Sequence, residues 1–209
     1  MNVAVKVADA NNLYGEDHMR KIAVSWFVII MTVLMIACIA SAGSPPAAGG
    51  VLPDIKLPIP KDSADKNYLG LGFFGFGSFK IPEIKARVVI VEIFSMYCPY
   101  CQREAPNLNQ LYANIEQNPA LKGKIKIIGI GAGNTSFEVG TFKKKYNVPF
   151  PLFADEDYVI HKTLGEVRTP YFIGVKINSD GSHQVIHSKL GNLEGVDQFL
   201  EMIVKLSGL

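Results

Sequence analysis

The most regular hydrophobic pattern in the chain is an almost unbroken apolar run, Val88–Phe94, which only Glu92 interrupts. Such a run is typical of a strand that is buried on both faces of a parallel sheet. A helical pattern follows from Pro99 to about Asn118, with apolar residues along one face and with Pro106 inside it, where we expect a kink. The two segments predict the first half of a βαβ unit.

The same alternation continues to the end of the chain. Further strands are expected at Lys124–Ile130, Phe150–Phe153, Tyr171–Ile177 and Ser182–Leu190, and further helices at Ser136–Tyr146, Asp155–Leu164 and Asn192–Ser207. Asn134 or Thr135 is expected to cap the first of these helices, and Asp155 and Gly165 to begin and end the second. The turn at 178–181 makes the last two strands a hairpin. This order predicts an α/β fold with a central mixed sheet flanked by helices.

The N-terminal part of the chain has a different pattern. Residues 22–42 carry no charge and are numerous enough to span a membrane as a helix. Because Arg20 and Lys21 precede them, the rest of the chain is expected to lie on the far side of that membrane. Residues 19–43 are interpreted as a signal peptide or an N-terminal membrane anchor, with translation starting at Met19 and residues 1–18 a mis-assigned extension. Cys38 is interpreted as an apolar residue of this segment, with lipidation as the alternative.

Two segments connect this part to the region of alternating strands and helices. Residues 44–66 are rich in Pro, Gly and Ala and are expected to form a linker and an extended lead-in. Residues 68–79 interleave glycine with aromatic residues, which indicates an edge strand or hairpin that packs phenylalanine side chains onto the sheet; an apolar surface for a partner is the alternative. The folded domain is expected at 67–209.

Composition and charge exclude several classes of function. The chain is 48% hydrophobic and 19% charged, as in a globular protein, and its net charge of +2 gives no reason to expect a nucleic-acid partner. Two of its three cysteines lie in the expected domain, which is too few for a disulfide scaffold. The scattered histidines supply no second half of a zinc site, so no metal is expected.

The two cysteines of the domain lie two residues apart, in Cys98-Pro99-Tyr100-Cys101, directly after the predicted strand and at the start of the predicted helix. Free backbone N–H groups and the helix dipole stabilise a thiolate there, and the thiolate is the species that attacks disulfides. Cys98 is therefore the expected nucleophile and Cys101 the resolving thiol. An inert buried pair is the alternative, which the position at a strand end disfavours.

Glu92 is the second informative residue, because a carboxylate in a buried strand must lose its water and its pKa must rise. We expect it to donate and accept the proton of Cys101 during exchange. The alternatives are a strand end that reaches solvent, or an ion pair with Lys85 or Lys126.

Two further positions allow more than one interpretation. Glu104 lies one turn beyond Cys101, where it has a capping or surface role or tunes the thiols electrostatically. Thr169-Pro170 precedes a predicted strand, where a proline makes a rigid turn that can be cis. The residues alone do not place this turn beside Cys98.

Together these positions resemble the TlpA-like group of exported thiol–disulfide oxidoreductases, which have a thioredoxin fold. The resemblance covers about residues 53–207 and rests on the two cysteines, on Glu92 six residues before Cys98, on Glu104, Pro106 and Thr169-Pro170, on the strand Tyr171–Val175 and on the insertion Ser136–Phe153. Tyr97 replaces the tryptophan of many relatives. No basic residue lies between the cysteines, so strong-oxidant behaviour is not indicated.

The resemblance implies a thioredoxin-like domain with an N-terminal extension and a central helix-strand insertion. It implies that Cys98 and Cys101 exchange disulfides with exported proteins and need no cofactor beyond their own disulfide. Thr169 and Pro170 would face the pair and bind substrate together with Pro99 and Tyr100. A membrane electron donor or acceptor would recharge the cysteines at the periplasmic or other extracytoplasmic face of the membrane.

Three other functions stay open. A peroxiredoxin-like thiol peroxidase fits Ser95, three residues before Cys98, although Val91 stands where that motif has proline. A non-enzymatic, membrane-anchored binding module would use the glycine and phenylalanine residues of 68–79. A copper chaperone would use both thiols, with Met96 as the adjacent soft ligand.

Overall fold

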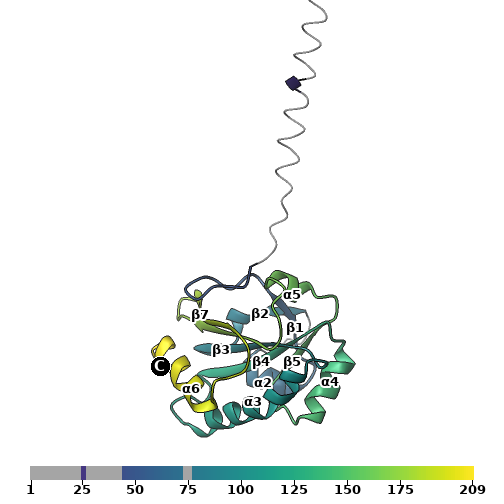
Figure 1. The fold of residues 1–209 in the computed structure, drawn as a ribbon. Helices are drawn as coiled ribbons and strands as arrows, with labels where there is room; N and C mark the ends of the chain where they lie inside the picture. The colour runs from purple at the N-terminus through teal and green to yellow at the C-terminus, as the bar shows by residue number, and fades with distance from the viewer. Residues whose placement is uncertain (1–24, 27–43, 73–76) are drawn as a thin grey trace, which may run out of the picture. The chain divides into compact units, whose positions relative to one another are not determined.

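The computed structural model describes residues 25–26, 44–72 and 77–209, and Ala42–Leu209 form one compact unit (Figure 1). The signal peptide or anchor predicted at 19–43 lies outside the described residues, apart from Ser25 and Trp26. Among the residues that are described, no helix combines the length and the apolar character that crossing a bilayer requires.

The fold is built on a mixed sheet of five strands in the order β5-β4-β3-β6-β7. The strands are β3 (Val88–Phe94), β4 (Ile125–Ala132), β5 (Leu152–Asp155), β6 (Tyr171–Ile177) and β7 (His183–Leu190). β3 is central, parallel to β4 and antiparallel to β6, and every residue of β3 is buried. The predicted central mixed sheet is therefore confirmed, and the apolar run that predicted β3 is its buried middle strand.

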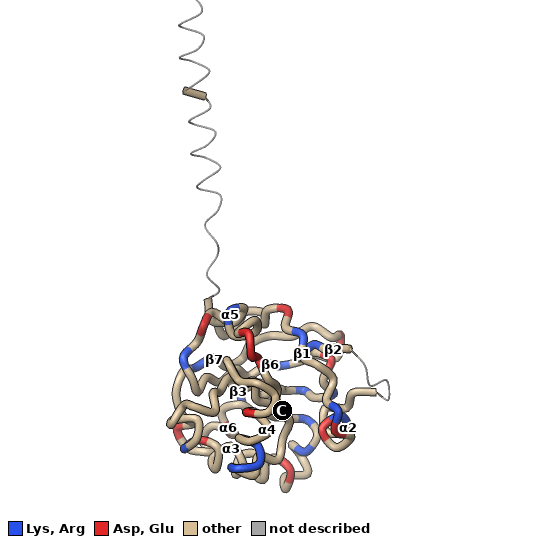
Figure 2. Tube along the Cα trace, turned by 90° about the vertical axis from the view of Figure 1, so that its right-hand side faces the viewer, with Lys and Arg blue, Asp and Glu red and all other residues tan. Residues whose placement is uncertain are grey.

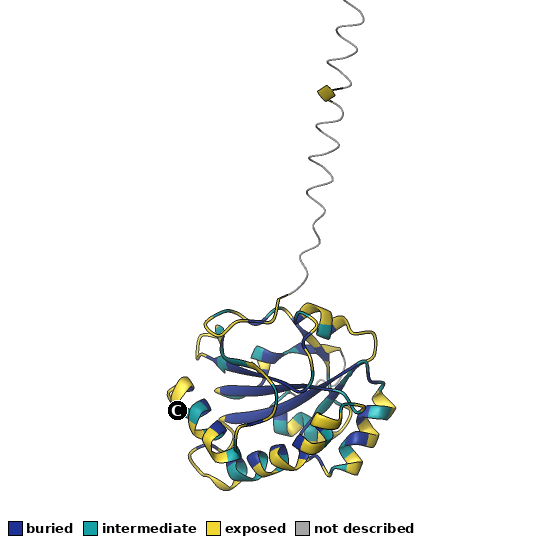
Figure 3. Cartoon of the chain, viewed as in Figure 1, coloured by how far each residue is buried: buried dark blue, intermediate teal, exposed yellow. Residues whose placement is uncertain are grey.

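Helices cover both faces of this sheet (Figure 1). The apolar residues of α3 (Pro99–Gln117), α4 (Ser136–Lys145) and α6 (Val196–Ser207) form one buried cluster with one face of the sheet. α5 (Val159–Thr163), the 3-10 helix η1 (Ile81–Glu83) and the strands β1 and β2 pack on the other face. Figure 3 shows the strands buried between these layers. Helix α3 continues through Pro106.

The predicted helix starts are confirmed for α4 and corrected for α5. The Thr135 hydroxyl accepts a hydrogen bond from the Glu138 N–H at 3.2 Å, and the Glu138 carboxylate accepts one from the Thr135 N–H at 2.8 Å, which makes a capping box. Asp155 ends β5 instead of beginning a helix, and α5 starts at Val159. The Asp155 carboxylate nevertheless accepts hydrogen bonds from two N–H groups of α5, at 3.0 and 2.8 Å.

The segment expected to be a linker contains regular structure. β1 (Lys56–Pro58) pairs with β2 (Ser78–Lys80), and α2 (Ser63–Leu69) begins inside the expected linker, where the Asp62 side chain caps it. Leu52, Ile55 and Leu57 are buried, so these apolar residues hold the segment against the sheet even though prolines and glycines dominate its composition.

The edge strand predicted for the glycine and aromatic residues of 68–79 is wrong at its beginning. Tyr68 and Leu69 end helix α2, and only Ser78–Lys80 form a strand; residues 73–76 lie outside the described residues. Helix α6 also starts later than predicted, at Val196, because Gly195 adopts a φ of 111° and the residues before it form a loop.

Tyr68 ties α2 to the central sheet. β5 pairs with β4 only from Gly129 onward, so the Ile127 N–H lies beyond the end of β5. The Tyr68 hydroxyl accepts a hydrogen bond from this N–H at 2.8 Å. Burial raises the pKa of Tyr68, so the hydroxyl stays protonated and a buried backbone donor is satisfied.

We predict that Tyr68→Phe lowers the free energy of unfolding by about 1–3 kcal/mol, because the Ile127 N–H loses its acceptor inside the protein. Denaturant unfolding measures the change. Tyr112→Phe is the matched control, since the Tyr112 ring lies 5.8 Å from that of Tyr68 and its removed hydroxyl makes no hydrogen bond to the described residues. Equal losses in the two variants would contradict this role for Tyr68.

Candidate active site

Both cysteines of the motif lie at the N-terminus of α3, as predicted. Cys98 is the N-cap residue and is partly exposed, whereas Cys101 lies in the first turn and is completely buried. Both are free thiols. The strand β3 delivers them, because only Ser95, Met96 and Tyr97 separate its end from Cys98.

Thr169 and Pro170 lie beside the nucleophile, as the resemblance implies. The peptide bond between them is cis. The Cys98 thiol donates a hydrogen bond to the Thr169 carbonyl oxygen at 3.3 Å, across 71 positions of sequence. The Gly191 N–H also donates a hydrogen bond to the Pro170 carbonyl at 3.0 Å, which ties the loop after β7 to this turn.

The two thiols differ in acidity because their surroundings differ. Partial burial alone would raise the pKa of Cys98, but hydrogen bonds from the Thr169 side chain, from the Cys101 N–H and thiol and from the Tyr100 N–H outweigh it, and the pKa is lowered. Burial raises the pKa of Cys101, and the nearby Glu92 carboxylate raises it further. Cys98 is therefore the thiol that ionises first, and Cys101 holds its proton.

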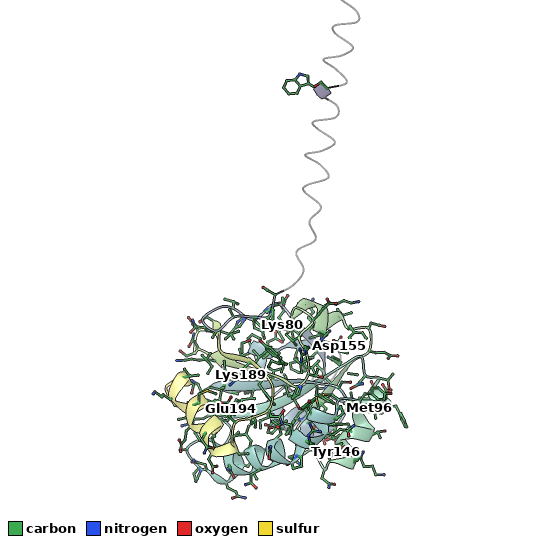
Figure 4. All side chains as sticks on the ribbon, in the orientation of Figure 1. Lys80, Met96, Tyr146, Asp155, Lys189 and Glu194 are labelled. Carbon is green, nitrogen blue, oxygen red and sulfur yellow. The ribbon has the colours of Figure 1, made fainter. Side chains whose placement is uncertain are left out.

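The loop that carries Cys98 is held by two amide side chains. The Met96 N–H donates to the Asn134 side-chain oxygen at 2.8 Å, and the Gln102 side chain donates to the Met96 carbonyl at 2.8 Å; Met96 is labelled in Figure 4. Asn134 is fully buried and was predicted only as a possible helix cap. An asparagine two residues after the end of a central strand is the sequence signal that could have suggested this role.

Glu92 lies deep in the sheet and keeps only 1% of its surface exposed, so a strand end that reaches solvent is wrong. Pairing with lysine is wrong too. Glu92 stands opposite Gly129 in the register of β3 and β4, whereas Lys126 stands opposite Val89 and faces the other side of the sheet. Lys85 is exposed, and no ion pair within 44–72 and 77–209 includes Glu92.

The environment of Glu92 favours its neutral form. Burial, followed by the charges of Glu104 and Cys98, raises its pKa from 4.5 to about 8. A carboxyl group with this pKa beside Cys101 can take up and return a proton near neutral pH. Its part in exchange stays a prediction.

Glu104 is fully buried, so a surface role for it is wrong. Its Oε1 accepts hydrogen bonds from the Leu193 N–H at 3.0 Å and from the Asn107 side chain at 3.4 Å. Burial nevertheless raises the pKa of Glu104. The contact with Leu193 could not be predicted from the sequence, because it joins residues that are 89 positions apart.

A groove of about 800 Å³ runs beside the contact between Cys98 and Thr169. Its lining includes Ser95, Tyr100, His161, Arg168, Pro170 and Leu190. Tyr100, Thr169 and Pro170 thus border a common space, as predicted for substrate-binding residues, whereas Pro99 is exposed on the first turn of α3 and does not line the groove. Their role in binding stays a prediction.

Positively and negatively charged residues are interspersed over the folded part of the chain (Figure 2). Arg168 and His161 line the groove together with Glu166. Arg103 lies over the Tyr100 ring, with its guanidinium carbon 4.5 Å from the ring centroid. Within the described part of the chain, no group of three or more His, Cys, Asp or Glu side chains is placed to hold a metal ion.

Comparison with known protein families gives a match to the AhpC/TSA family over residues 49–189, which is more than half of the chain. The chain belongs to this family. Two curated relatives are named thiol-disulfide oxidoreductase ResA. The one from Halalkalibacterium halodurans is 25% identical over 60% of this chain and 68% of its own length, and the one from Bacillus thuringiensis subsp. konkukian is 29% identical over 59% and 68%.

Solved structures confirm the fold of this AhpC/TSA family member. A putative thiol:disulfide interchange protein DsbE from Chlorobium tepidum matches 78% of this chain and 99% of its own, with a TM-score of 0.58 and 16% identity. StoA from Bacillus subtilis matches 73% and 97%, with a TM-score of 0.50 and 17% identity. The predicted thioredoxin fold is confirmed, and the family and its relatives identify an enzyme of the thiol–disulfide oxidoreductase class.

We predict that iodoacetamide at pH 7 modifies Cys98 at least about tenfold faster than Cys101, because only Cys98 is partly exposed and has a lowered pKa. Mass spectrometry of the two peptides over time measures the ratio. Cys98→Ser is the control: its remaining Cys101 should react only after denaturation. Fast modification of Cys101 in the folded variant would contradict its burial.

We predict that Glu92→Gln stabilises the protein at alkaline pH. The native state holds the Glu92 proton more tightly than the unfolded chain does, so wild-type stability falls as the pH rises from 4.5 through about 8. The variant should gain a few kcal/mol at pH 9, with about 5 kcal/mol as the ceiling that this difference in pKa allows, and almost nothing at pH 4.

Denaturant unfolding at the two pH values measures this gain. Glu201→Gln, at an exposed position of α6, is the control and should change little at either pH. A gain for Glu92→Gln that is the same at pH 4 and pH 9 would show that ionisation of Glu92 is not its cause.

Proposed function

We propose that the protein is an exported thiol–disulfide oxidoreductase that exchanges disulfides with protein substrates through Cys98 and Cys101. The observation that carries this proposal is the position of the Cys98 thiol, which is partly exposed at a helix N-terminus and in contact with the Thr169 carbonyl. The family and the names of the relatives support the same chemistry.

In the reducing direction, the Cys98 thiolate attacks one sulfur of a substrate disulfide. A bond forms between Cys98 and that sulfur, and the other substrate sulfur leaves as a thiolate and takes a proton from water. Glu92 then accepts the proton of Cys101, and the Cys101 thiolate attacks the Cys98 sulfur. The disulfide between Cys98 and Cys101 forms as the second substrate thiolate leaves and takes the proton from Glu92, so the protein gives up two electrons and two protons.

The groove beside Thr169 supports an extended substrate segment. No side chain or backbone group of the described residues accepts a hydrogen bond from the Thr169 N–H. A substrate strand can pair with this backbone while its cysteine reaches Cys98, which is a form of strand addition. The exposed side chains of Tyr100, Tyr158 and Leu190 along the groove offer apolar contact to the residues next to that cysteine.

The proposed location and partners follow from the N-terminal sequence. Arg20 and Lys21 precede the uncharged residues 22–42, which favours a periplasmic or other extracytoplasmic domain, exported or anchored by residues 20–42. Each substrate disulfide that is reduced leaves the cysteine pair oxidised, so a membrane electron donor must reduce it again; an acceptor serves the opposite direction. The disulfide itself is the redox group, and we propose no further cofactor.

We predict that Cys101→Ala accumulates mixed disulfides between Cys98 and substrate proteins, because the resolving thiol is absent. Non-reducing electrophoresis and mass spectrometry of the exported fraction measure them, and a dithiol reductant should release them. Cys98→Ser is the control and should capture no partner.

Three outcomes would contradict the proposed function. If Cys101→Ala captures no partner, the proposed exchange of disulfides with protein substrates is contradicted. Capture that survives in Cys98→Ser would indicate a binding module instead. Catalytic consumption of peroxide with a dithiol reductant would indicate the peroxidase alternative.

A further inference from the structure

Two carboxyl groups lie beneath the active-site turn of α3. Glu104 follows Cys101 by three residues, which places both on the buried face of the helix. Glu92 comes from β3 below it and faces the same side of the sheet as Ile90 and Phe94. Ile90, Phe94 and Cys101 belong to one buried cluster, so both carboxyl groups lie in the same apolar layer.

No cation balances these two groups in the described parts of the chain. None of the ion pairs there includes either glutamate. Glu92 Oε1 and Glu104 Oε2 are both buried without a hydrogen-bond partner. The strand neighbours of Glu92 are Gly129 in β4 and Phe172 in β6, which carry no charge.

The remaining titratable groups around the two carboxyls are few. On α3 they are Cys98 and Cys101. On the side of Leu193, His187 and Lys189 of β7 and Glu194 line a shallow cavity with it. Lys189 forms an ion pair with Glu194; both side chains are labelled in Figure 4. Burial lowers the pKa of His187.

We propose that Glu92 and Glu104 form a coupled pair that holds one proton between them, with the proton on Glu92 and the negative charge on Glu104. Two carboxylates in an apolar layer without a cation cannot both ionise readily. The charge belongs on Glu104 because the Leu193 N–H and the Asn107 side chain donate hydrogen bonds to it. Glu92 Oε1, in contrast, is buried and accepts no hydrogen bond from the described residues.

This inference deepens the proposed function and rests on it for its consequence. The charge on Glu104 disfavours ionisation of Glu92, so Glu104 sets the pH at which Glu92 can accept the proton of Cys101. Glu104 thus acts through Glu92 and is a positioning residue, whereas Glu92 meets the reacting thiol. Burial makes the larger contribution to the raised pKa of Glu92, and the charge of Glu104 adds to it.

The test is a carboxyl titration of the full-length reduced protein in detergent, labelled with carbon-13 at the glutamate carboxyl and followed by NMR. Glu104→Gln should lower the Glu92 midpoint by about one pH unit, because the like charge is gone. Glu92→Gln should leave the Glu104 midpoint almost unchanged, because Glu104 ionises in the wild type while Glu92 is still protonated and neutral. Glu201→Gln should move neither midpoint.

The kinetic counterpart is the pH dependence of the rate at which Cys101 attacks a mixed disulfide on Cys98. Cys98 is first joined to a chromophoric thiol, and release of that thiol reports the attack of Cys101. In Glu104→Gln, the midpoint of this pH profile should shift to lower pH by the same amount as the titration midpoint of the Glu92 carboxyl. Glutamine keeps an oxygen for the Leu193 N–H, so a loss of packing alone would slow the step without shifting its midpoint.

An unchanged Glu92 midpoint in Glu104→Gln would overturn the coupled pair. If Glu104→Gln does not fold, a wild-type titration in which Glu104 ionises at a higher pH than Glu92 overturns the assignment alone. The titration needs no substrate, so it separates this inference from the proposed function. Coupled carboxyls in a protein that captures no partner would refute the function only, and uncoupled carboxyls in an active enzyme would refute the pair only.

Discussion

The site depends on the placement of the first turn of α3 on the end of the most buried strand of the sheet. β3 has neighbours on both sides and helices over both faces, so its end is fixed in position. Cys98 therefore meets free N–H groups of the helix start while it stays partly exposed, and Cys101, three residues later, is turned inward. One helix turn produces a thiol that ionises readily beside a thiol that does not.

Local patterns in the sequence were sufficient for the centre of the fold. The apolar run predicted β3, the spacing of apolar residues predicted α3, and the position of the cysteines between them predicted the helix start, because each depends on neighbouring residues only. Glu92 was recognised for the same reason, since a charge inside a buried strand is visible in the sequence. The resemblance to a known group added the placement of Pro170.

Contacts between distant parts of the chain could not be predicted in this way. The thiol of Cys98 and the carbonyl of Thr169 are 71 positions apart, and the link from Asn134 to Met96 spans 38. The composition of the segment before residue 67 predicts a linker, yet its few apolar residues pack on the sheet. The Leu193 N–H, in the loop before helix α6, donates a hydrogen bond to the buried Glu104 carboxylate across 89 positions.

The hydrogen bond from the Leu193 N–H to Glu104 affects which substitutions the loop before α6 can accept. The Leu193 N–H donates a hydrogen bond to the Glu104 carboxylate. Gly191, two residues earlier, donates one to the Pro170 carbonyl and borders the groove. A single short loop therefore joins a wall of the groove to the buried Glu104 carboxyl group. If the groove and Glu104 act as proposed, a substitution that reshapes this loop for a new substrate also changes the surroundings of the carboxyl groups near the thiols, which couples the evolution of specificity to that of the chemistry.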